Sequence, residues 1–338
     1  MKRSFQQIFY WCRLLIVFAL FPALAACGRP PLADDSPQYR DGHVTVAFAG
    51  VSFTGDFKDN KKNYPYSYEI VTRTAKDSLD RILGEKLLAR AAGNPNVSFH
   101  LGLLNMEEAA EAIAVSFAID LEKVSVSEIA EGYKTVVSIY SEILAFDFKE
   151  KKIIGTYPLN FEYITLFKHN PTEKEIKDIF LALYLGGNPE IKTNILDYAA
   201  EQIAKIRFYR HAPHRLKVSE VSLGERAVEV LQELKADPEE FKTFLAQGFG
   251  AYLTSNQGVS VLPYTKGQAI GSKMSARFSN GTVYNMEIPE GDYSVKLTLR
   301  NLRAESARER SVMIWAYFAY LNIQITQDDL NEVYFDWL

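Results

Sequence analysis

The stretch VTVAFAGVSF, Val44 to Phe53, is the first part of the chain that has the character of a buried β-strand. Its apolar residues run almost without interruption, as in strands that are covered on both faces. A helical pattern follows from Thr74 to Ala92, where apolar residues recur three and four positions apart. Thr74 and Asp77 have the spacing of a capping box and predict the start of this helix. The folded part therefore begins with a strand followed by a helix.

Further strands and helices follow in mixed order through the first half of the chain. Apolar runs predict strands at Val97–Leu103, Ala114–Val126 and Lys134–Phe148, with a return strand to about Ile164. The turn before the return strand is expected at Lys149–Lys151. Helical spacing predicts Glu173–Leu185 and Ile191–Phe208, which the breaker sequence GGNP separates.

The pattern of strands and helices restarts after Pro213. Val218–Val230 fits a strand or a helix, and both alternatives stay open. Asp237 as N-cap and Pro238 as the first helical residue predict a helix that runs to Leu253. Further strands are predicted at Val259–Tyr264, Lys273–Phe278, Tyr293–Leu302 and Ser311–Ile325, and a short helix is expected to begin within Thr326–Val333.

These signals predict the α+β class, with two sheet-and-helix units. The expected order is a signal peptide at residues 1–26, a tether at 27–42, one α+β domain at 43–212 and a second at 213–338. A tandem duplication is one explanation for the presence of two similar units. Six apolar positions of the first unit lie 176 residues before apolar positions of the second: Phe117, Ile119, Leu121, Val136, Val137 and Ile143 precede Tyr293, Val295, Leu297, Val312, Met313 and Ala319. A duplication and a coincidence between two long hairpins explain this spacing equally well.

The amino-terminal sequence predicts export. Basic residues near the start precede the short apolar run Leu14–Phe21, which is the pattern of a secretory signal peptide. Leu24-Ala25-Ala26-Cys27 resembles the lipobox of bacterial lipoproteins. That resemblance implies cleavage before Cys27 and a lipid on its sulfur. Gly28, rather than Asp, follows the cysteine, which by the enteric rule implies the inner leaflet of the outer membrane, facing the periplasm.

The order of elements also resembles two envelope proteins. Val44–Phe53, Thr74–Ala92 and the hairpin within Thr135–Ile154 give a strand, a helix and a meander of long strands. This order is similar to the amino-terminal domain of TolB and to the curli-secretion lipoprotein CsgG. The CsgG resemblance implies a subunit of an oligomeric secretion or assembly complex.

Composition limits the other classes of function. Cys12 and Cys27 are the only cysteines, so a chain cut before Cys27 and lipidated there has no disulfide. Loss of residues 1–26 leaves 35 basic and 42 acidic residues, a formal charge of −7, which disfavours nucleic acid as a partner. No elbow, P-loop or zinc-protease motif is present, so we predict no enzyme, cofactor or metal, and the sequence identifies no small-molecule substrate. The expected function is a binding or scaffold component, which contacts the membrane through Cys27 and has other envelope proteins as partners. An envelope hydrolase is the less favoured alternative.

Two further segments have two interpretations each. The basic group near the domain junction is either a solvated loop or an anion-binding site, and consists of Arg207, Arg210, His211, His214 and Arg215. Metal ligation there is disfavoured by the surrounding positive charge. The aromatic stretch Trp315–Tyr320 is either a core strand or a surface for a partner.

The lipid anchor gives the first testable prediction. Cys27→Ala should abolish fatty-acid labelling and give a soluble or unprocessed product, because only that sulfur suits the modification. Cys12→Ala is the matched control and should change nothing, since residue 12 is removed with the signal peptide. Metabolic labelling and mass spectrometry of the amino-terminal peptide measure this. An unmodified Cys27 in a protein that still fractionates with membranes would contradict it.

Overall fold

The protein was analysed as a computed structural model that describes most of the chain after residue 43. The described residues are 44–54, 64–71, 78–92, 94–103, 113–129, 131–192, 194–206, 208, 215–234, 236–257, 259–264, 273–278, 282–309, 312–327, 330 and 332–337. The predicted signal peptide, Cys27 and the tether lie outside these residues.

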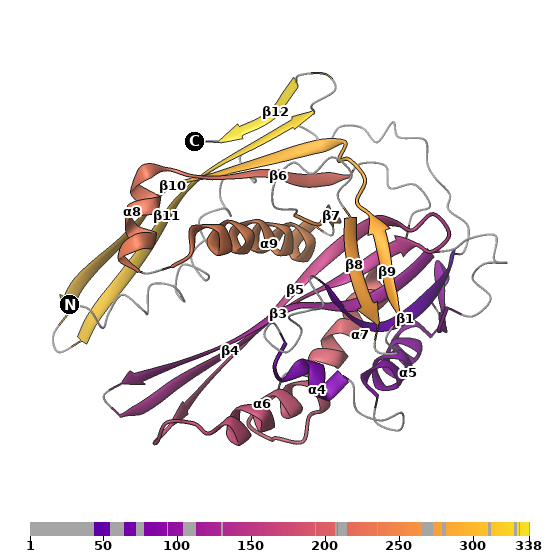
Figure 1. The fold of residues 1–338 in the computed structure, drawn as a ribbon, viewed down its shortest axis with the longest axis horizontal. Coiled ribbons are helices and arrows are strands. Elements are labelled where there is room, and N and C mark those ends of the chain that lie inside the picture. Colours follow the sequence, from indigo (N-terminus) through magenta and orange to yellow (C-terminus); the bar gives the residue numbers. More distant parts are fainter. Residues whose placement is uncertain are drawn as a thin grey trace.

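Strands and helices mix along the whole described chain (Figure 1). The strands are β1 Val44–Thr54, β2 Val97–Leu101, β3 Ile113–Ile129, β4 Gly132–Asp147, β5 Lys152–Phe167, β6 Leu216–Leu223, β7 Val261–Leu262, β8 Lys273–Phe278, β9 Val283–Glu287, β10 Tyr293–Glu309, β11 Val312–Gln327 and β12 Glu332–Trp337. The helices are α4 Ser67–Val71, α5 Leu79–Ala91, α6 Glu173–Leu185, α7 Ile195–Lys205, α8 Glu225–Glu233 and α9 Pro238–Gln257. The predicted α+β class is confirmed.

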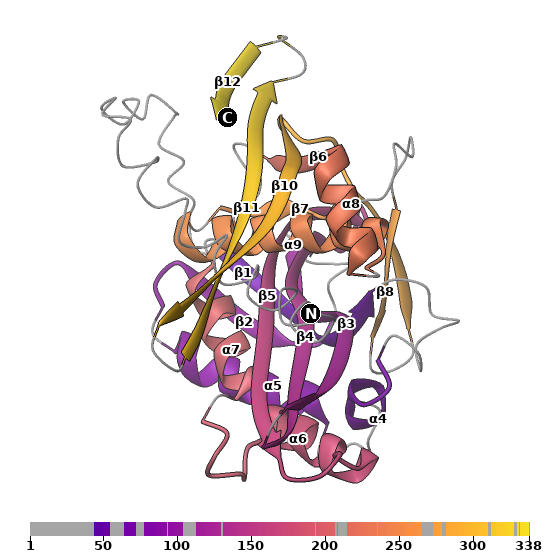
Figure 2. The same ribbon diagram turned by 90° about the vertical axis from the view of Figure 1, so that its left-hand side faces the viewer.

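All described strands belong to one sheet. Its order is β12-β11-β10-β6-β7-β5-β4-β3-β1-β8-β9, and β2 pairs with β1 outside this path. β1 runs parallel to β3, whereas β3, β4 and β5 form an antiparallel meander of long strands (Figure 2). The short β7 joins the two parts, because it pairs with β6 on one side and with Thr156 of β5 on the other. The division at residues 210–217 stays a prediction.

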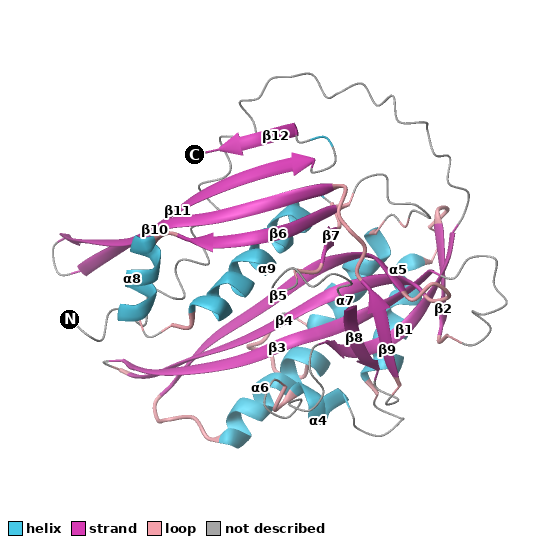
Figure 3. Cartoon of the chain, turned by 45° about the horizontal axis from the view of Figure 1, so that its top comes forward, coloured by secondary structure: helices cyan, strands magenta, loops and turns pink. Residues whose placement is uncertain are grey.

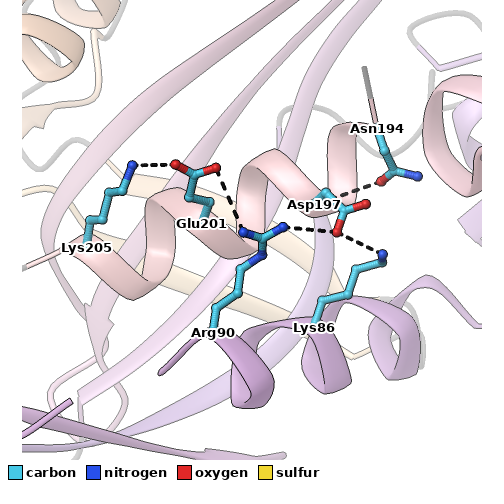
Figure 4. Close-up of polar contacts among 6 residues, drawn as sticks. All are labelled: Lys86, Arg90, Asn194, Asp197, Glu201 and Lys205. Atoms are coloured by element: carbon cyan, nitrogen blue, oxygen red, sulfur yellow. Dashed lines mark hydrogen bonds and ion pairs between the residues drawn. The ribbon is translucent and has the colours of Figure 1, made fainter. Parts of the chain in front are cut away.

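One helical layer covers β1, β3, β4 and β5. Its core contains Phe117 and Ile143 from the sheet and Leu83, Phe180 and Leu196 from α5, α6 and α7. Charged side chains add to the contact between α5 and α7 (Figure 4). Lys86 and Arg90 of α5 lie 2.9 and 3.2 Å from Asp197 of α7, and hydrogen bonding to Lys86 lowers the pKa of that carboxyl. These side chains are partly solvated, so packing of the apolar core provides most of the stability.

The opposite face of the same strands meets α9, which lies between the two parts of the sheet (Figures 1 and 3). Phe241, Leu245 and Phe249 of α9 pack in a second core with β6, β10 and β11. Toward β4 and β5, Phe244 makes an edge-on contact with Tyr140, with ring centroids 6.4 Å apart. A helix covered on two sides is expected to be apolar all round, which fits the sequence FKTFLAQGFGAYL.

The first part of the sheet closes on itself. β8 pairs with β1, β9 pairs with β8, and Glu287 of β9 pairs with Lys152 of β5. The six strands β5-β4-β3-β1-β8-β9 thereby form a ring. Apolar side chains of mixed size fill its interior, in which Ala47, Ala118 and Ala276 lie in one cluster with Phe146 and Phe278. The ring centroids of the two phenylalanines are 6.3 Å apart.

The two parts of the chain share one pattern of strand pairing. β3 and β4 correspond to β10 and β11 at an offset of 180 residues, which corrects the offset of 176 inferred from the sequence, with a bulge at Asp120 in one hairpin and at Arg300 in the other. The first residues of β12 pair with β11 in the same register as the first residues of β5 pair with β4, again at an offset of 180 residues. β1 against β3 matches β6 against β10, again with a bulge at the same place. A tandem duplication would produce these matches, and it stays a prediction.

Most of the local sequence predictions describe the structure well. Glu173–Leu185 and Lys273–Phe278 have the predicted bounds, and Asp237 accepts a hydrogen bond from the backbone N–H of Glu239 at 2.7 Å. The ambiguous Val218–Val230 contains both the end of β6 and the start of α8. Of the segment Thr326–Val333, where a short helix was expected to begin, Thr326 and Gln327 belong to β11, Glu332 and Val333 belong to β12, and Leu330 has 3₁₀ conformation. The residues of β12 instead satisfy their backbone groups by pairing with β11.

A pair of leucine variants tests the assignment of the core. Leu83 of α5 is fully buried, whereas Leu166 near the end of β5 is 67% exposed. Leu83→Ala should lower the free energy of unfolding by about 2–5 kcal/mol, because it removes buried methyl groups and leaves a cavity. Leu166→Ala should change it by less than about 0.5 kcal/mol. Urea denaturation measures both values, and equal losses for the two variants would contradict the described packing.

Candidate functional site

A cavity of about 400 Å³ lies between α9 and the strands of the first part of the sheet. Its polar lining comes from seven side chains on different elements: Thr54, Tyr64, Asp120, Glu142, Thr156, Gln247 and Ser275, together with Tyr264 after β7. Its apolar lining includes Pro158, Val261, Leu262, Met274 and Ile288. A cavity of this size with a few convergent polar groups is typical of a small-molecule site.

Two carboxyl groups from neighbouring strands face this cavity. Glu142 lies on β4 directly opposite Ala118 of β3. Asp120 occupies the bulge of β3, between Ile119 and Leu121, where the pairing with β4 shifts by one residue. A bulge changes the direction of a side chain relative to the regular strand. Here it brings Asp120 to the same side of the sheet as Glu142.

Asp120 is half-buried and is held by the end of β1. The hydroxyl of Thr54 donates a hydrogen bond to Oδ1 of Asp120, and the hydroxyl of Tyr64 donates to the backbone carbonyl of Thr54. Burial raises the pKa of Asp120 to about 7, against the opposing effect of the Thr54 hydrogen bond. Burial also raises the pKa of Tyr64, and the charge of Asp120 adds to that rise. Asp120 therefore titrates near neutral pH, while Tyr64 stays protonated.

Glu142 is buried, and its surroundings favour the protonated form. Burial raises the pKa of this carboxyl well above its usual value, and the nearby charge of Asp120 raises it further. Its neighbour Thr156 donates its hydroxyl hydrogen to the backbone carbonyl of Val261 at 2.7 Å. The contact of Glu142 with Thr156 acts in the opposite direction and lowers this pKa, but burial has the larger effect.

A third acidic residue of β3 has a structural role on the other face of the sheet. Glu122 accepts hydrogen bonds from the backbone N–H groups of Tyr66 and Ser67, the latter at 2.9 Å. These groups lie at the start of α4, where backbone N–H groups have no partner within the helix. The Ser67 hydroxyl lies 2.9 Å from the buried hydroxyl of Tyr184. Glu122 therefore fixes α4 to the sheet and does not line the cavity.

The site residues expected from the sequence lie elsewhere. Arg207, Arg210, His211 and His214 are outside the described residues, as is Cys27. Arg215 is described, and its Nε and one terminal guanidinium nitrogen lie 3.2 and 3.3 Å from the carboxylate of Asp292. An anion at this position would compete with that carboxylate. Anion binding by the whole group stays a prediction.

Sequence reasoning missed Asp120 and Glu142, although a signal for them is present. Each is an ionisable residue inside a run of strand residues that is otherwise apolar or small, AVSFAIDL and YSEILAF. An acid placed where a strand is covered on both faces is expected to be buried, and buried acids are frequent at functional sites. The bulge that reorients Asp120 is set by pairing with a distant strand and has no marker in the local sequence.

Two general features were also sought in the described part of the chain. No group of three or more histidine, cysteine, aspartate or glutamate side chains there is placed to hold a metal ion. No described helix has the length and apolar character needed to cross a membrane.

Comparison with known proteins gives matches in structure alone. No protein-family model and no curated protein matches the sequence. Solved structures with similar parts include a minor lipoprotein from Acinetobacter baumannii (9% identity, 47% of this chain, 87% of that one, TM-score 0.24). Another is a neuraminyllactose-binding hemagglutinin homologue from Helicobacter pylori (14% identity, 52% of this chain, 87% of that one, TM-score 0.26). A third is a hypothetical protein from Chlamydia trachomatis (10% identity, 43% of this chain, 88% of that one, TM-score 0.21). Similarity this low supports no argument about function.

The raised pKa of Asp120 predicts a dependence of stability on pH. An aspartate titrates near pH 4 in an unfolded chain. Between that pH and about 7, the folded state binds the proton more tightly, so the free energy of unfolding falls as the pH rises. Asp120→Asn should remove most of this fall and should raise the melting temperature by a few degrees at pH 8. Melting curves from pH 5 to pH 8 measure the effect.

Glu150 provides the control for this measurement, because it is an exposed acid in the β4–β5 turn. Glu150→Gln should leave the pH dependence of the wild-type protein in place. If Asp120→Asn and the wild-type protein lose stability equally between pH 5 and pH 8, the assignment of Asp120 as a titrating buried group is wrong.

Proposed function

We propose that the protein is a lipid-anchored, non-enzymatic binding component of the bacterial envelope, and that its cavity takes a small ligand carrying a positive charge. The cavity provides the main support for the binding role. Asp120 and Glu142 line it, and no lysine or arginine is among the lining residues that the structure describes. An ammonium group placed beside Asp120 would favour the ionised carboxylate and offset the cost of burying it.

The anchor and the location rest on the sequence. Leu24–Cys27 has the lipobox pattern, and Gly28 in place of Asp favours the outer membrane. A tether of residues 28–42 reaches at most about 50 Å, which lets the folded part stand off the inner leaflet in the periplasm. Other envelope proteins are the expected macromolecular partners.

The cavity also favours a second candidate, an envelope hydrolase. Glu142, with a pKa raised well above its usual value, lies beside an Asp120 with a pKa of about 7, and such a pair has the properties of a general acid and a general base. The binding role is preferred because the sequence carries none of the catalytic motifs that were sought. The subunit of a secretion complex implied by the CsgG resemblance remains a further alternative.

A pair of matched probes tests the proposed ligand class. 1,4-Diaminobutane and 1,4-butanediol have the same length, but only the diamine is charged. The diamine should bind at pH 8 and should bind at least about tenfold more weakly at pH 6, because protonation of Asp120 removes the charge that it pairs with. Asp120→Asn should weaken binding by a similar factor at pH 8. Isothermal titration calorimetry measures these affinities.

Glu150→Gln is again the control and should bind the diamine like the wild-type protein, because Glu150 lies in the distant turn. Equal binding of the diamine and the diol, or no heat at millimolar diamine, would overturn the cationic ligand class. Turnover of an ester or glycoside substrate that survives purification and is lost in Asp120→Asn would favour the hydrolase.

A further inference from the structure

The outer edge of β11 is paired over only part of its length. On its inner side, β10 pairs with β11 from Val312 to Thr326. On its outer side, β12 pairs with it only from Ile323 to Gln327. No other strand in the described part of the chain pairs with β11, so the outer edge is unoccupied by strands from Val312 to Asn322. Backbone N–H and C=O groups along such an edge are able to pair with another strand.

In the first part of the chain, the strand that corresponds to β11 has a neighbour along its outer edge. β4 corresponds to β11, and its residues Tyr133 to Glu142 pair with Pro158 to Phe167 of β5 in an antiparallel register. β12 matches only the start of β5, up to the pair between Ile323 and Trp337. The pairing pattern that supports a full antiparallel neighbour in the first hairpin is therefore repeated in the second, where the described β12 covers Ile323 to Gln327.

The sequence of the β11 edge is unusual for a strand left at the margin of a sheet. VMIWAYFAYLN, residues 312–322, contains no charged residue, no proline and no glycine. Exposed edges in monomeric proteins are generally protected by lysine, by proline or by a bulge. From Val312 to Tyr320 this edge has no lysine and no proline. It also has no bulge there, because β10 and β11 pair in regular register from the pair Asn301–Tyr320 to the pair Glu309–Val312. An uncharged strand also pairs with a copy of itself without placing like charges opposite each other.

Two aromatic side chains of β11 are exposed to solvent beside this edge. Phe318 and Tyr320 are 42% and 47% exposed. The residue that corresponds to Tyr320 in the first hairpin is Tyr140, which is 5% exposed and packs against Phe244 of α9. Burial of such aromatic surface by a neighbouring chain is favourable, at roughly 25 cal/mol per Å² of apolar area.

We propose that β11 is a self-association strand, and that the β11 edge of one molecule pairs antiparallel with the same edge of a second molecule across a two-fold axis. An antiparallel contact between identical strands is self-complementary, since each residue of one copy meets the partner residue that meets it in return. The result is a sheet continuous through both molecules, in which each β11 takes the place that β5 has beside β4. Phe318 and Tyr320 of both copies then lie together on one face of the joined sheet.

The oligomeric state of the unlipidated chain tests this proposal. In a Cys27→Ala background, sedimentation velocity should show a dimer whose proportion rises with protein concentration. A double variant, Phe318→Lys with Tyr320→Lys, should raise the dissociation constant at least tenfold, because lysines of both copies meet in the contact. The control is Ile164→Lys with Leu166→Lys on β5, at positions that are 50% and 67% exposed, and it should dimerise normally.

A second measurement gives a positive signal without relying on a destabilised variant. In a Cys12→Ala, Cys27→Ala chain, a spin label at Tyr320→Cys should show a short distance to the label on the second molecule, within about 20 Å. A label at Leu166→Cys should show no such short distance. A protein that is monomeric at 100 µM, or a dimer that the β11 lysines leave intact, overturns the proposal. A dimer that the β5 lysines disrupt instead also overturns it.

Discussion

The packing of α9 against two surfaces is the contact on which the rest of the arrangement depends. One side of the helix is buried by β6, β10 and β11 through Phe241, Leu245 and Phe249. The other side meets β4 and β5, where a Cβ on Gly250 would lie in ordinary van der Waals contact with Cγ of Pro158, at 3.5 Å. A helix that is apolar on one stripe alone would leave one of these surfaces in water. Because α9 satisfies both, the cavity between it and the sheet has a fixed wall.

That wall explains why two acids are tolerated inside the sheet. Asp120 and Glu142 are costly to bury as charges, and the raised pKa values show that the fold favours their neutral forms. Thr54, Thr156 and Tyr64 connect them to backbone carbonyls rather than to basic residues. A purely structural acid is generally paired with a base or with backbone N–H groups, as Glu122 is at the start of α4. Among the described residues, Asp120 and Glu142 have no partner of this kind, which supports the proposal of a ligand.

Local sequence patterns predicted the elements well and the long-range pairings poorly. The Thr172 capping box and Gly186 define α6 within a few residues of sequence, so its bounds were predictable. The β3–β4 hairpin follows from two adjacent apolar strands. By contrast, the pairing of Lys152 with Glu287 that closes the ring joins residues far apart in the chain, and no local pattern records it. The cavity is formed by that closure and by α9. The local sequence around Asp120 and Glu142 predicts strands and does not indicate that these two side chains line a common cavity.

The two halves share one pattern of strand pairing but differ in what covers the strands. The bulge that holds Asp120 in β3 holds Arg300 in β10, and Asn322 stands where Glu142 stands in β4. In the first half this face is covered by α9, so the polar residues face an enclosed cavity. In the second half Arg300 is exposed, and Asn322 has a buried Oδ1 with no hydrogen-bond partner among the described residues. Polar groups at matched positions thus line a site in one half and a partly open surface in the other. The difference comes from which helix covers the sheet, since the strand register is the same in both.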